Sequence, residues 1–219
     1  SSEQKLNLIK NKVNEICNKK QLKIIPQVIA VTKTFAFTQI EPLLITGHDH
    51  FGENKIQEAE NKWNKIKDIY PNLQLHMLGK LQSNKAKKAV KLFDYIHSLD
   101  NSKLAEKISK YENELGKKVK IFIQVNLAEE SQKSGILVKN LNNFFNFCAK
   151  DLSLNIIGLM CIPPVDSESN SFFKILKKLS EDLNLKHLSM GMSKDYEDAI
   201  ICGATYIRLG TAIMGERKS

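Results

Sequence analysis

A single lysine stands where a buried strand would end. The apolar run 28–31 follows Pro26, a pattern typical of a strand in a hydrophobic interior. Lys33 follows this run, between Thr32 and Thr34, with Phe35 and Phe37 just beyond. A lysine that is partly removed from water and lies near other cations has a lowered pKa and can attack an aldehyde. The alternative, which suits an isolated lysine better, is that the side chain extends to solvent.

Two glycine-containing segments near the C-terminus could bind a phosphate. Gly191, Met192 and Ser193 precede one predicted helix, and Gly210 with Thr211 precedes another. Glycine lets the backbone approach an anion, while free N–H groups and the helix dipole favour negative charge. Taken singly, Ser193 and Thr211 are more simply explained as helix N-caps. If the two segments lie side by side, they hold one phosphate from two sides.

Strands and helices alternate along the chain. An amphipathic helix is predicted over 3–20, and eight strand-like segments follow, each with a helix or turn after it. The strand-like segments are 27–33, 48–54, 73–79, 95–100, 118–127, 154–162, 185–191 and 205–210. The helical segments between and after them are 38–47, 56–70, 83–93, 101–116, 137–150, 167–183, 194–203 and the short 211–215.

Helix-end signals support part of this assignment. Thr38 could cap the helix 38–47, which then requires Pro42 in its first turn. Ser83 is a further cap candidate, Asn101 or Ser102 could begin the next helix, and Gly116 could end it.

Eight successive strand–helix units predict a closed parallel (β/α)8 barrel preceded by one extra helix, all in a single domain spanning 1–219. A doubly wound open sheet is the alternative, weakened because no GxGxxG follows the first strand. In a barrel the functional site lies at the carboxyl ends of the strands. The first and last strands are neighbours there, so Lys33 would lie beside Arg208 and the phosphate segments. A lysine, a phosphate cradle and a polar partner for a heterocycle are what pyridoxal phosphate (PLP) requires.

Composition excludes several other classes. The 219 residues carry a net charge of +9 and contain no apolar run near the ~20 residues of a membrane span. The basic residues are spread out, and the densest group, 84–91, fits a solvated helix face better than a nucleic-acid site. The four cysteines form no CxxC pair, which argues against disulfides or zinc and favours a reducing, cytoplasmic setting. His48 and His50 are interpreted as a polar strand start rather than as metal ligands.

Several longer motifs extend from the first strand to the C-terminus. They are AVTK (30–33), HFGENKIQE (50–58), LGKLQSNK (78–85), IHSLD (96–100), IQVNLAEESQKSG (123–135), GLMCIPP (158–164) and the long block at 188–215. Together these motifs resemble the pyridoxal phosphate homeostasis proteins, which are similar to the barrel domain of alanine racemase.

The resemblance assigns roles to particular residues. Lys33 matches the lysine that forms a Schiff base with PLP, and Arg208 matches the arginine that faces the pyridine nitrogen. Since arginine cannot accept a proton, the ring nitrogen should stay unprotonated and PLP should be a weaker electron sink. The remaining matches are Ser193 with Gly191 and Met192 on one side of the phosphate, Gly210 and Thr211 on the other, Asn54 near the lysine, and Met160 and Ser189 lining the pocket.

Some positions depart from the family pattern. KTFAFT (33–38) replaces a common Lys-Pro pair, so Phe35 and Phe37 should change the packing of the first loop. Lys55 stands where FGENY is usual, and Met214 where an aromatic residue is common.

The resemblance implies a carrier of PLP rather than an enzyme. Alanine racemases need a second domain and a tyrosine from it across a dimer interface, and this chain ends at residue 219. We therefore expect a monomeric protein of vitamin B6 homeostasis without robust catalysis, which delivers PLP to apo-enzymes. The alternatives are a weak PLP-dependent amino-acid racemase or lyase and, less in keeping with the sequence, a nucleic-acid-binding barrel.

Overall fold

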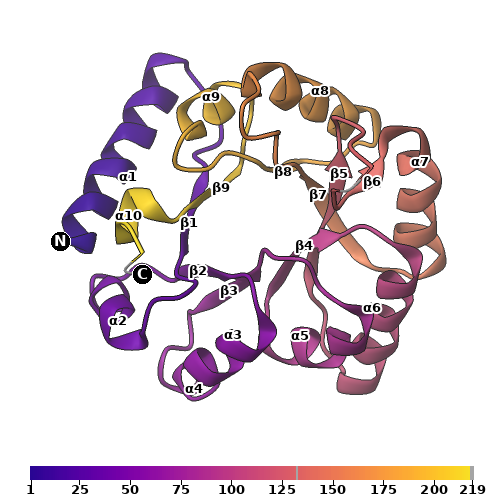
Figure 1. The fold of residues 1–219 in the computed structure, drawn as a ribbon, viewed down its shortest axis with the longest axis horizontal. Coiled ribbons are helices and arrows are strands. Elements are labelled where there is room, and N and C mark those ends of the chain that lie inside the picture. Colours follow the sequence, from indigo (N-terminus) through magenta and orange to yellow (C-terminus); the bar gives the residue numbers. More distant parts are fainter. Residues whose placement is uncertain (132, 218–219) are drawn as a thin grey trace.

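Parallel strands close into a barrel surrounded by helices (Figure 1). The structure, a computed structural model, describes residues 1–131 and 133–217. Eight strands form the ring, and β4 pairs with β5 to close it. They are β1 (Gln27–Val31), β2 (His50–Glu53), β3 (Gln74–Met77), β4 (Tyr95–Leu99), β5 (Lys120–Asn126), β7 (Asn155–Met160), β8 (His187–Ser189) and β9 (Tyr206–Leu209). The predicted (β/α)8 barrel is confirmed, and the open sheet is excluded.

The first and last barrel strands pair in parallel, as the strand order predicts. Ile29 lies opposite Arg208, and Ala30 lies opposite Leu209. A short strand that the sequence did not indicate, β6 (Ile136–Leu137), pairs with the end of β5 outside the ring. The β1–β9 register brings the carboxyl ends of both strands to the same mouth of the barrel.

Helices cover the outside of the ring (Figure 1). They are α1 (Ser2–Lys19), α2 (Phe37–Ile45), α3 (Ile56–Trp63), α4 (Ile66–Ile69), α5 (Ala86–Leu92), α6 (Ser102–Leu115), α7 (Val138–Asn146), α8 (Ser169–Asp182), α9 (Tyr196–Ile201) and α10 (Thr211–Met214). A 3₁₀ turn, η1 (Ser83–Lys85), precedes α5, and a π-helical segment, η2 (Phe147–Asp151), follows α7.

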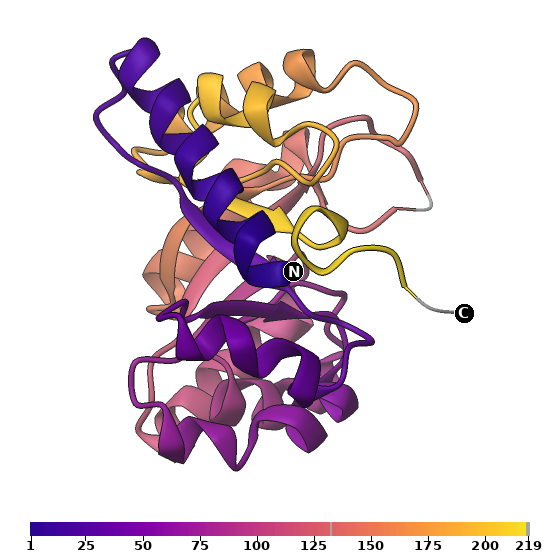
Figure 2. The same ribbon diagram turned by 90° about the vertical axis from the view of Figure 1, so that its left-hand side faces the viewer.

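The N-terminal helix packs against the barrel's outer layer. The α1 helix runs across α9 and α10 (Figure 2). Leu6, Ile9 and Val13 are buried in this contact, while Ile16, the fourth residue of the predicted stripe, is only partly buried. Among the described residues, no helix combines the length and apolar character that crossing a membrane demands.

Several helix ends differ from the predictions. α2 begins at Phe37, because the Ala36 amide donates to Gln39 Oε1 at 3.2 Å, so Thr38 is not the cap and Pro42 lies in the second turn. The predicted helix 56–70 is two helices, α3 and α4, and Ser83 lies in η1 without a capping bond. The predictions at the ends of α6 are confirmed: Asn101 caps its start, and Gly116 ends it in the left-handed region.

Candidate functional site

Lys33 lies at the carboxyl end of the barrel, in the turn between β1 and α2. The strand itself ends at Val31, so the lysine is carried by the turn rather than by the strand as predicted. Burial lowers the pKa of the Lys33 ammonium, Arg217 lowers it further, and Glu58 acts in the opposite direction. Within the described ranges, Lys33 makes neither a hydrogen bond nor an ion pair. A half-buried amine with a lowered pKa has the property that attack on an aldehyde requires.

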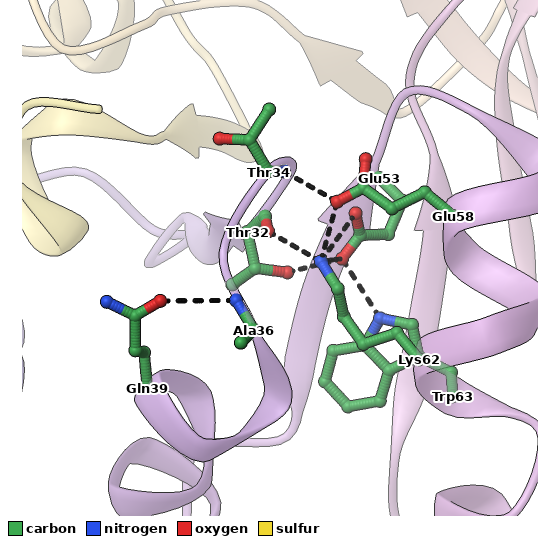
Figure 3. Close-up of polar contacts among 8 residues, drawn as sticks. All are labelled: Thr32, Thr34, Ala36, Gln39, Glu53, Glu58, Lys62 and Trp63. Atoms are coloured by element: carbon green, nitrogen blue, oxygen red, sulfur yellow. Dashed lines mark hydrogen bonds and ion pairs between the residues drawn. The ribbon is translucent and has the colours of Figure 1, made fainter. Parts of the chain in front are cut away.

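A polar network fixes the turn on both sides of Lys33 (Figure 3). The Thr32 hydroxyl donates to Glu53 Oε2 at 2.6 Å, and the Thr32 carbonyl accepts from Lys62 Nζ at 2.7 Å. On the other side, the Thr34 amide, at φ +71°, donates to Glu58 Oε2. The backbone before and after the lysine is therefore anchored to β2 and α3.

The centre of this network is a buried ion pair. Lys62 Nζ lies 3.0 Å from Glu53 Oε2, and the two side chains are 6% and 0% exposed. Trp63 Nε1 donates to the same carboxylate at 2.9 Å. Burial raises the pKa of Glu53, and Lys62 with the hydrogen bonds from Thr32 and Trp63 partly offsets this. Since all partners of Glu53 are internal, it supports the turn instead of lining the mouth.

Asn54 follows β2 directly and is held by a close backbone approach. A Cβ atom at Gly79 would lie 2.3 Å from the Asn54 carbonyl oxygen and 2.8 Å from its Cα. Only glycine at position 79 therefore allows the segments after β2 and β3 to meet in this way. Asn54 is half-buried at the same mouth as Lys33.

The two proposed phosphate segments lie together. Ser193 Oγ accepts a hydrogen bond from the Ala212 amide at 3.1 Å, which joins the loop after β8 to the start of α10. The N-caps of α9 and α10 are Asp195 and Gly210, so neither Ser193 nor Thr211 caps its own helix. The Met192 amide, which we expected to be free, donates to Asp195 Oδ1 at 2.8 Å.

Gly191 is required at its position on two grounds. Its φ is +101°, in the left-handed region, and a Cβ there would lie 2.6 Å from the Cβ of Ala199. The Gly191 carbonyl accepts from the Arg208 amide at 2.9 Å, which aligns this loop with β9. The glycine therefore places the loop against the strand that carries Arg208.

Arg208 is a buried cation with neutral partners. Its Nη1 donates to Ser189 Oγ at 2.6 Å and its Nη2 to the Cys161 carbonyl at 3.0 Å. The residue is 4% exposed, and no carboxylate of the described residues forms an ion pair with it. Burial lowers the pKa of the guanidinium, the direction expected when a cation is enclosed.

Ser189 and Met160, which the resemblance placed in the pocket lining, are buried in the barrel interior. Both are fully buried, on neighbouring strands in register with each other. Met160 packs with Tyr95 and Phe122 in a small cluster inside the barrel. These two residues therefore form a floor beneath the mouth.

A cavity of about 340 Å³ opens beside this site, at the ends of β5 and β7. Its lining includes Gln124, Asn126, Cys161 and Pro163, and none of the predicted site residues. Cys161 connects the two features, because its carbonyl is the one that accepts from Arg208. The mouth thus combines an amine, a buried guanidinium, two joined glycine segments and an adjacent cavity.

Comparison with known proteins identifies the family. The model of the alanine racemase N-terminal domain matches residues 5–218. The chain belongs to this family. A pyridoxal phosphate homeostasis protein of Aquifex aeolicus is 36% identical over 203 residues, covering 88% of this chain and 87% of the relative.

One solved structure agrees with this assignment, and a more distant one shows the same fold. PipY from Synechococcus elongatus PCC7942, solved with PLP bound, is 36% identical and has a TM-score of 0.81, covering 93% of this chain and all of PipY. Alanine racemase from Corynebacterium glutamicum shares the fold at 15% identity, with a TM-score of 0.66 over 98% of this chain and 62% of the racemase.

Two supports of the site were not predicted from the sequence. Lys62 and Trp63 were not among the candidates, although Glu58 and Lys62 have the i,i+4 spacing of a helical ion pair. The contact of Gly79 with the backbone of Asn54 was not predicted either, because it depends on the β2–β3 register.

Proposed function

We propose that this protein binds PLP at the barrel mouth and serves in intracellular PLP homeostasis. One observation carries the proposal: β1–β9 pairing brings a half-buried lysine to the same mouth as a buried arginine that forms no ion pair with a carboxylate of the described residues. The names of the relatives and the PLP-bound PipY structure give independent support.

Each predicted residue has a role in this proposal. Lys33 supplies the amine that condenses with the PLP aldehyde to a Schiff base, releasing water. Arg208 faces the ring nitrogen, and a guanidinium, which only donates hydrogen bonds, suits an unprotonated nitrogen. The segments of Gly191, Met192 and Ser193 and of Gly210 and Thr211 hold the phosphate. Asn54 borders the lysine, and Met160 and Ser189 support the ring from below.

The residues present fit this cofactor. PLP supplies an aldehyde, a ring-nitrogen lone pair and a phosphate, and the mouth offers one complementary group for each. The phosphate requires one local change, because the Met192 and Ala212 amides are engaged with Asp195 and Ser193. An incoming phosphate would replace these side-chain acceptors, which keep the amides satisfied beforehand.

We further propose a carrier role without robust catalysis, in one PLP-binding domain spanning 1–219 that acts as a cytoplasmic monomer. Its partners would be apo-enzymes that receive PLP. The homeostasis names of the relatives support this role, and the four free cysteines suit a reducing compartment.

Absorbance spectroscopy with stoichiometric PLP tests the binding proposal. We expect a Schiff-base band in the wild-type protein and in Lys55→Ala, a control that removes an exposed lysine near the same mouth. We expect no such band in Lys33→Ala. Borohydride reduction should then place the label on Lys33. Labelling spread over other lysines, or a colourless wild-type protein, would contradict the proposal.

Incubation of the PLP-loaded protein with alanine or serine tests the carrier role separately. We expect turnover far below about 1 per second, the lower end of ordinary enzyme rates. Turnover at that rate or faster would favour the racemase or lyase alternative, while leaving the binding site as proposed.

A further inference from the structure

A continuous hydrogen-bonded chain crosses the barrel interior and ends on Arg208. His50 Nδ1 lies 2.9 Å from His76 Nε2, and His76 Nδ1 lies 2.9 Å from His97 Nε2. His97 Nδ1 lies 2.8 Å from Ser189 Oγ, which accepts from Arg208 Nη1 at 2.6 Å. The chain begins at the first residue of β2 and uses β3, β4 and β8 before it reaches β9.

The central members of the chain are enclosed and held in place. His76, His97 and Ser189 are fully buried. The His76 ring stacks on Tyr95 with a centroid distance of 4.0 Å, and the His97 ring stacks on Phe122 at 4.4 Å. Because each ring is fixed by stacking and by two short contacts, neither can turn to find other partners.

The direction of the hydrogen bonds follows from Arg208. A guanidinium can only donate, so Ser189 Oγ accepts from it, and the Ser189 proton must find an acceptor. That acceptor is His97 Nδ1, the other polar atom at Ser189 Oγ. His97 then carries its proton on Nε2 and donates to His76, which donates from its own Nε2 to His50. The opposite direction would leave a buried hydroxyl proton without a partner, which is unfavourable.

In this direction every dipole of the chain presents its negative end toward Arg208. We propose that the chain Ser189–His97–His76–His50 is a positioning relay that stabilises the buried Arg208 cation in place of a carboxylate and fixes its orientation toward the ligand. Enclosing a cation without a counter-ion is otherwise very unfavourable. A carboxylate would neutralise the guanidinium, whereas a row of neutral dipoles stabilises it and leaves its net charge in place.

The chain must stay neutral to act in this way. Burial lowers the pKa of His76 and of His97 well below the ordinary value, and Arg208 lowers that of His97 further. A protonated histidine would donate from both nitrogens and would add a second cation beside Arg208. At the far end His50 Nε2 faces Asp49 Oδ1 at 3.9 Å, which agrees with a proton on that nitrogen.

Only the identity of the ligand rests on the proposed function, namely that the group facing Arg208 is the PLP ring nitrogen. The chain itself is a property of the protein without ligand. A first measurement can therefore be made on the unliganded wild-type protein, and a second on its PLP complex.

The first test is ¹H–¹⁵N correlation NMR of protein labelled at histidine, which distinguishes protonated from unprotonated ring nitrogens. The sequence contains only five histidines, so the ring signals can be assigned. We expect His76 and His97 at neutral pH to be neutral and protonated on Nε2. A proton on Nδ1 of His97, or a doubly protonated ring at either position, would overturn the proposed direction of the chain.

The second test is PLP binding by matched variants. His97→Leu removes the acceptor for the Ser189 proton and should weaken PLP binding about tenfold or more. His97→Asn loses the same stacking on Phe122 but keeps an acceptor near the place of Nδ1, so most of the affinity should return. His187→Leu removes a histidine of β8 that lies outside the chain, with Nδ1 on Thr205 Oγ1 at 3.1 Å, and should bind PLP as the wild type does.

The outcomes separate the two proposals. If wild-type protein fails to bind PLP, the proposed function fails, and the NMR result still decides whether the chain exists. If wild type binds PLP, and His97→Leu binds it equally with an unchanged absorbance spectrum, the relay is wrong. Equal weakening in the Leu and Asn variants would also overturn it, because the loss would then come from stacking.

Discussion

Two buried cations of this barrel are stabilised in opposite ways. Lys62, under the turn that carries Lys33, contacts two carboxylates, those of Glu53 and Glu58, each at 3.0 Å. Arg208 lies on β9, which pairs with β1, and it contacts the Ser189 hydroxyl and the Cys161 carbonyl. The first cation is paired directly with carboxylates, whereas the direct partners of the second among the described residues are neutral.

This difference separates the structural role of Lys62 from the ligand-binding role that we propose for Arg208. A cation paired with internal carboxylates has no charge left for a ligand, and its network fixes the backbone of Thr32 and Thr34 around Lys33 (Figure 3). A cation whose direct partners are neutral dipoles keeps its net positive charge, which is then available to interact with a ligand in the mouth. Under the proposed function, Lys62 positions the backbone on both sides of Lys33, and Arg208 interacts with the ring nitrogen of PLP.

The largest expected effect is loss of the Lys62 charge. Lys62→Met should lower the free energy of unfolding by about 3–5 kcal/mol, because it leaves the buried Glu53 carboxylate unpaired. Urea denaturation measures this. Lys178→Ala is the control, since its pair with Asp182 is exposed and should be worth at most about 1 kcal/mol. The double variant Glu53→Gln with Lys62→Met should recover part of the loss, and a loss no larger than that of the control would contradict the buried pair.

Loss of the Arg208 charge should have a smaller effect on stability and a clear effect on binding. Arg208→Met removes a buried cation that forms no ion pair among the described residues, so relief of its desolvation should offset part of the lost hydrogen bonds to Ser189 and Cys161, and we expect a net loss of about 1–2 kcal/mol. PLP affinity should fall at least about tenfold. If the unliganded protein loses as much stability as Lys62→Met does, the two cations do not differ as described.

Lowering the pH should decrease the free energy of unfolding through the buried histidines of the barrel interior. The pKa values of folded His76 and His97 lie below the ordinary 6.5, so the unfolded chain binds more protons as pH falls below about 6.5. The free energy of unfolding then decreases with a slope that approaches about 1.4 kcal/mol per pH unit for each histidine that stays neutral in the folded protein. Urea unfolding between pH 6.5 and 5.5 should therefore show a smaller pH slope in His97→Asn than in the wild type. An unchanged slope would mean that His97 is protonated in the folded protein.

The sequence predicted the parts of the site that follow from strand order. Eight strand–helix units require a closed ring, and a closed ring places Lys33 at the same mouth as Arg208. The joining of the Ser193 and Thr211 segments follows from the same neighbour relation. These predictions depend only on the order of strands and helices along the chain, and not on the direction in which each side chain points.

The rest depends on register and packing. His50, His76, His97 and Ser189 come from four different strands, and their side chains meet only because the strand register brings them to successive heights inside the barrel. The burial of Glu53 is likewise set by α3 lying over it. Thr38 failed as a cap because the side chain of Gln39 satisfies the Ala36 amide, an option that the capping pattern alone did not distinguish.

The most direct test of the whole account is a crystal structure of the protein with PLP. We predict the aldehyde carbon joined to Lys33 Nζ, the ring nitrogen within about 3 Å of the Arg208 guanidinium, and the phosphate between the segments of Ser193 and Thr211. PLP bound through another lysine, or with its ring nitrogen on a carboxylate instead of Arg208, would contradict the account.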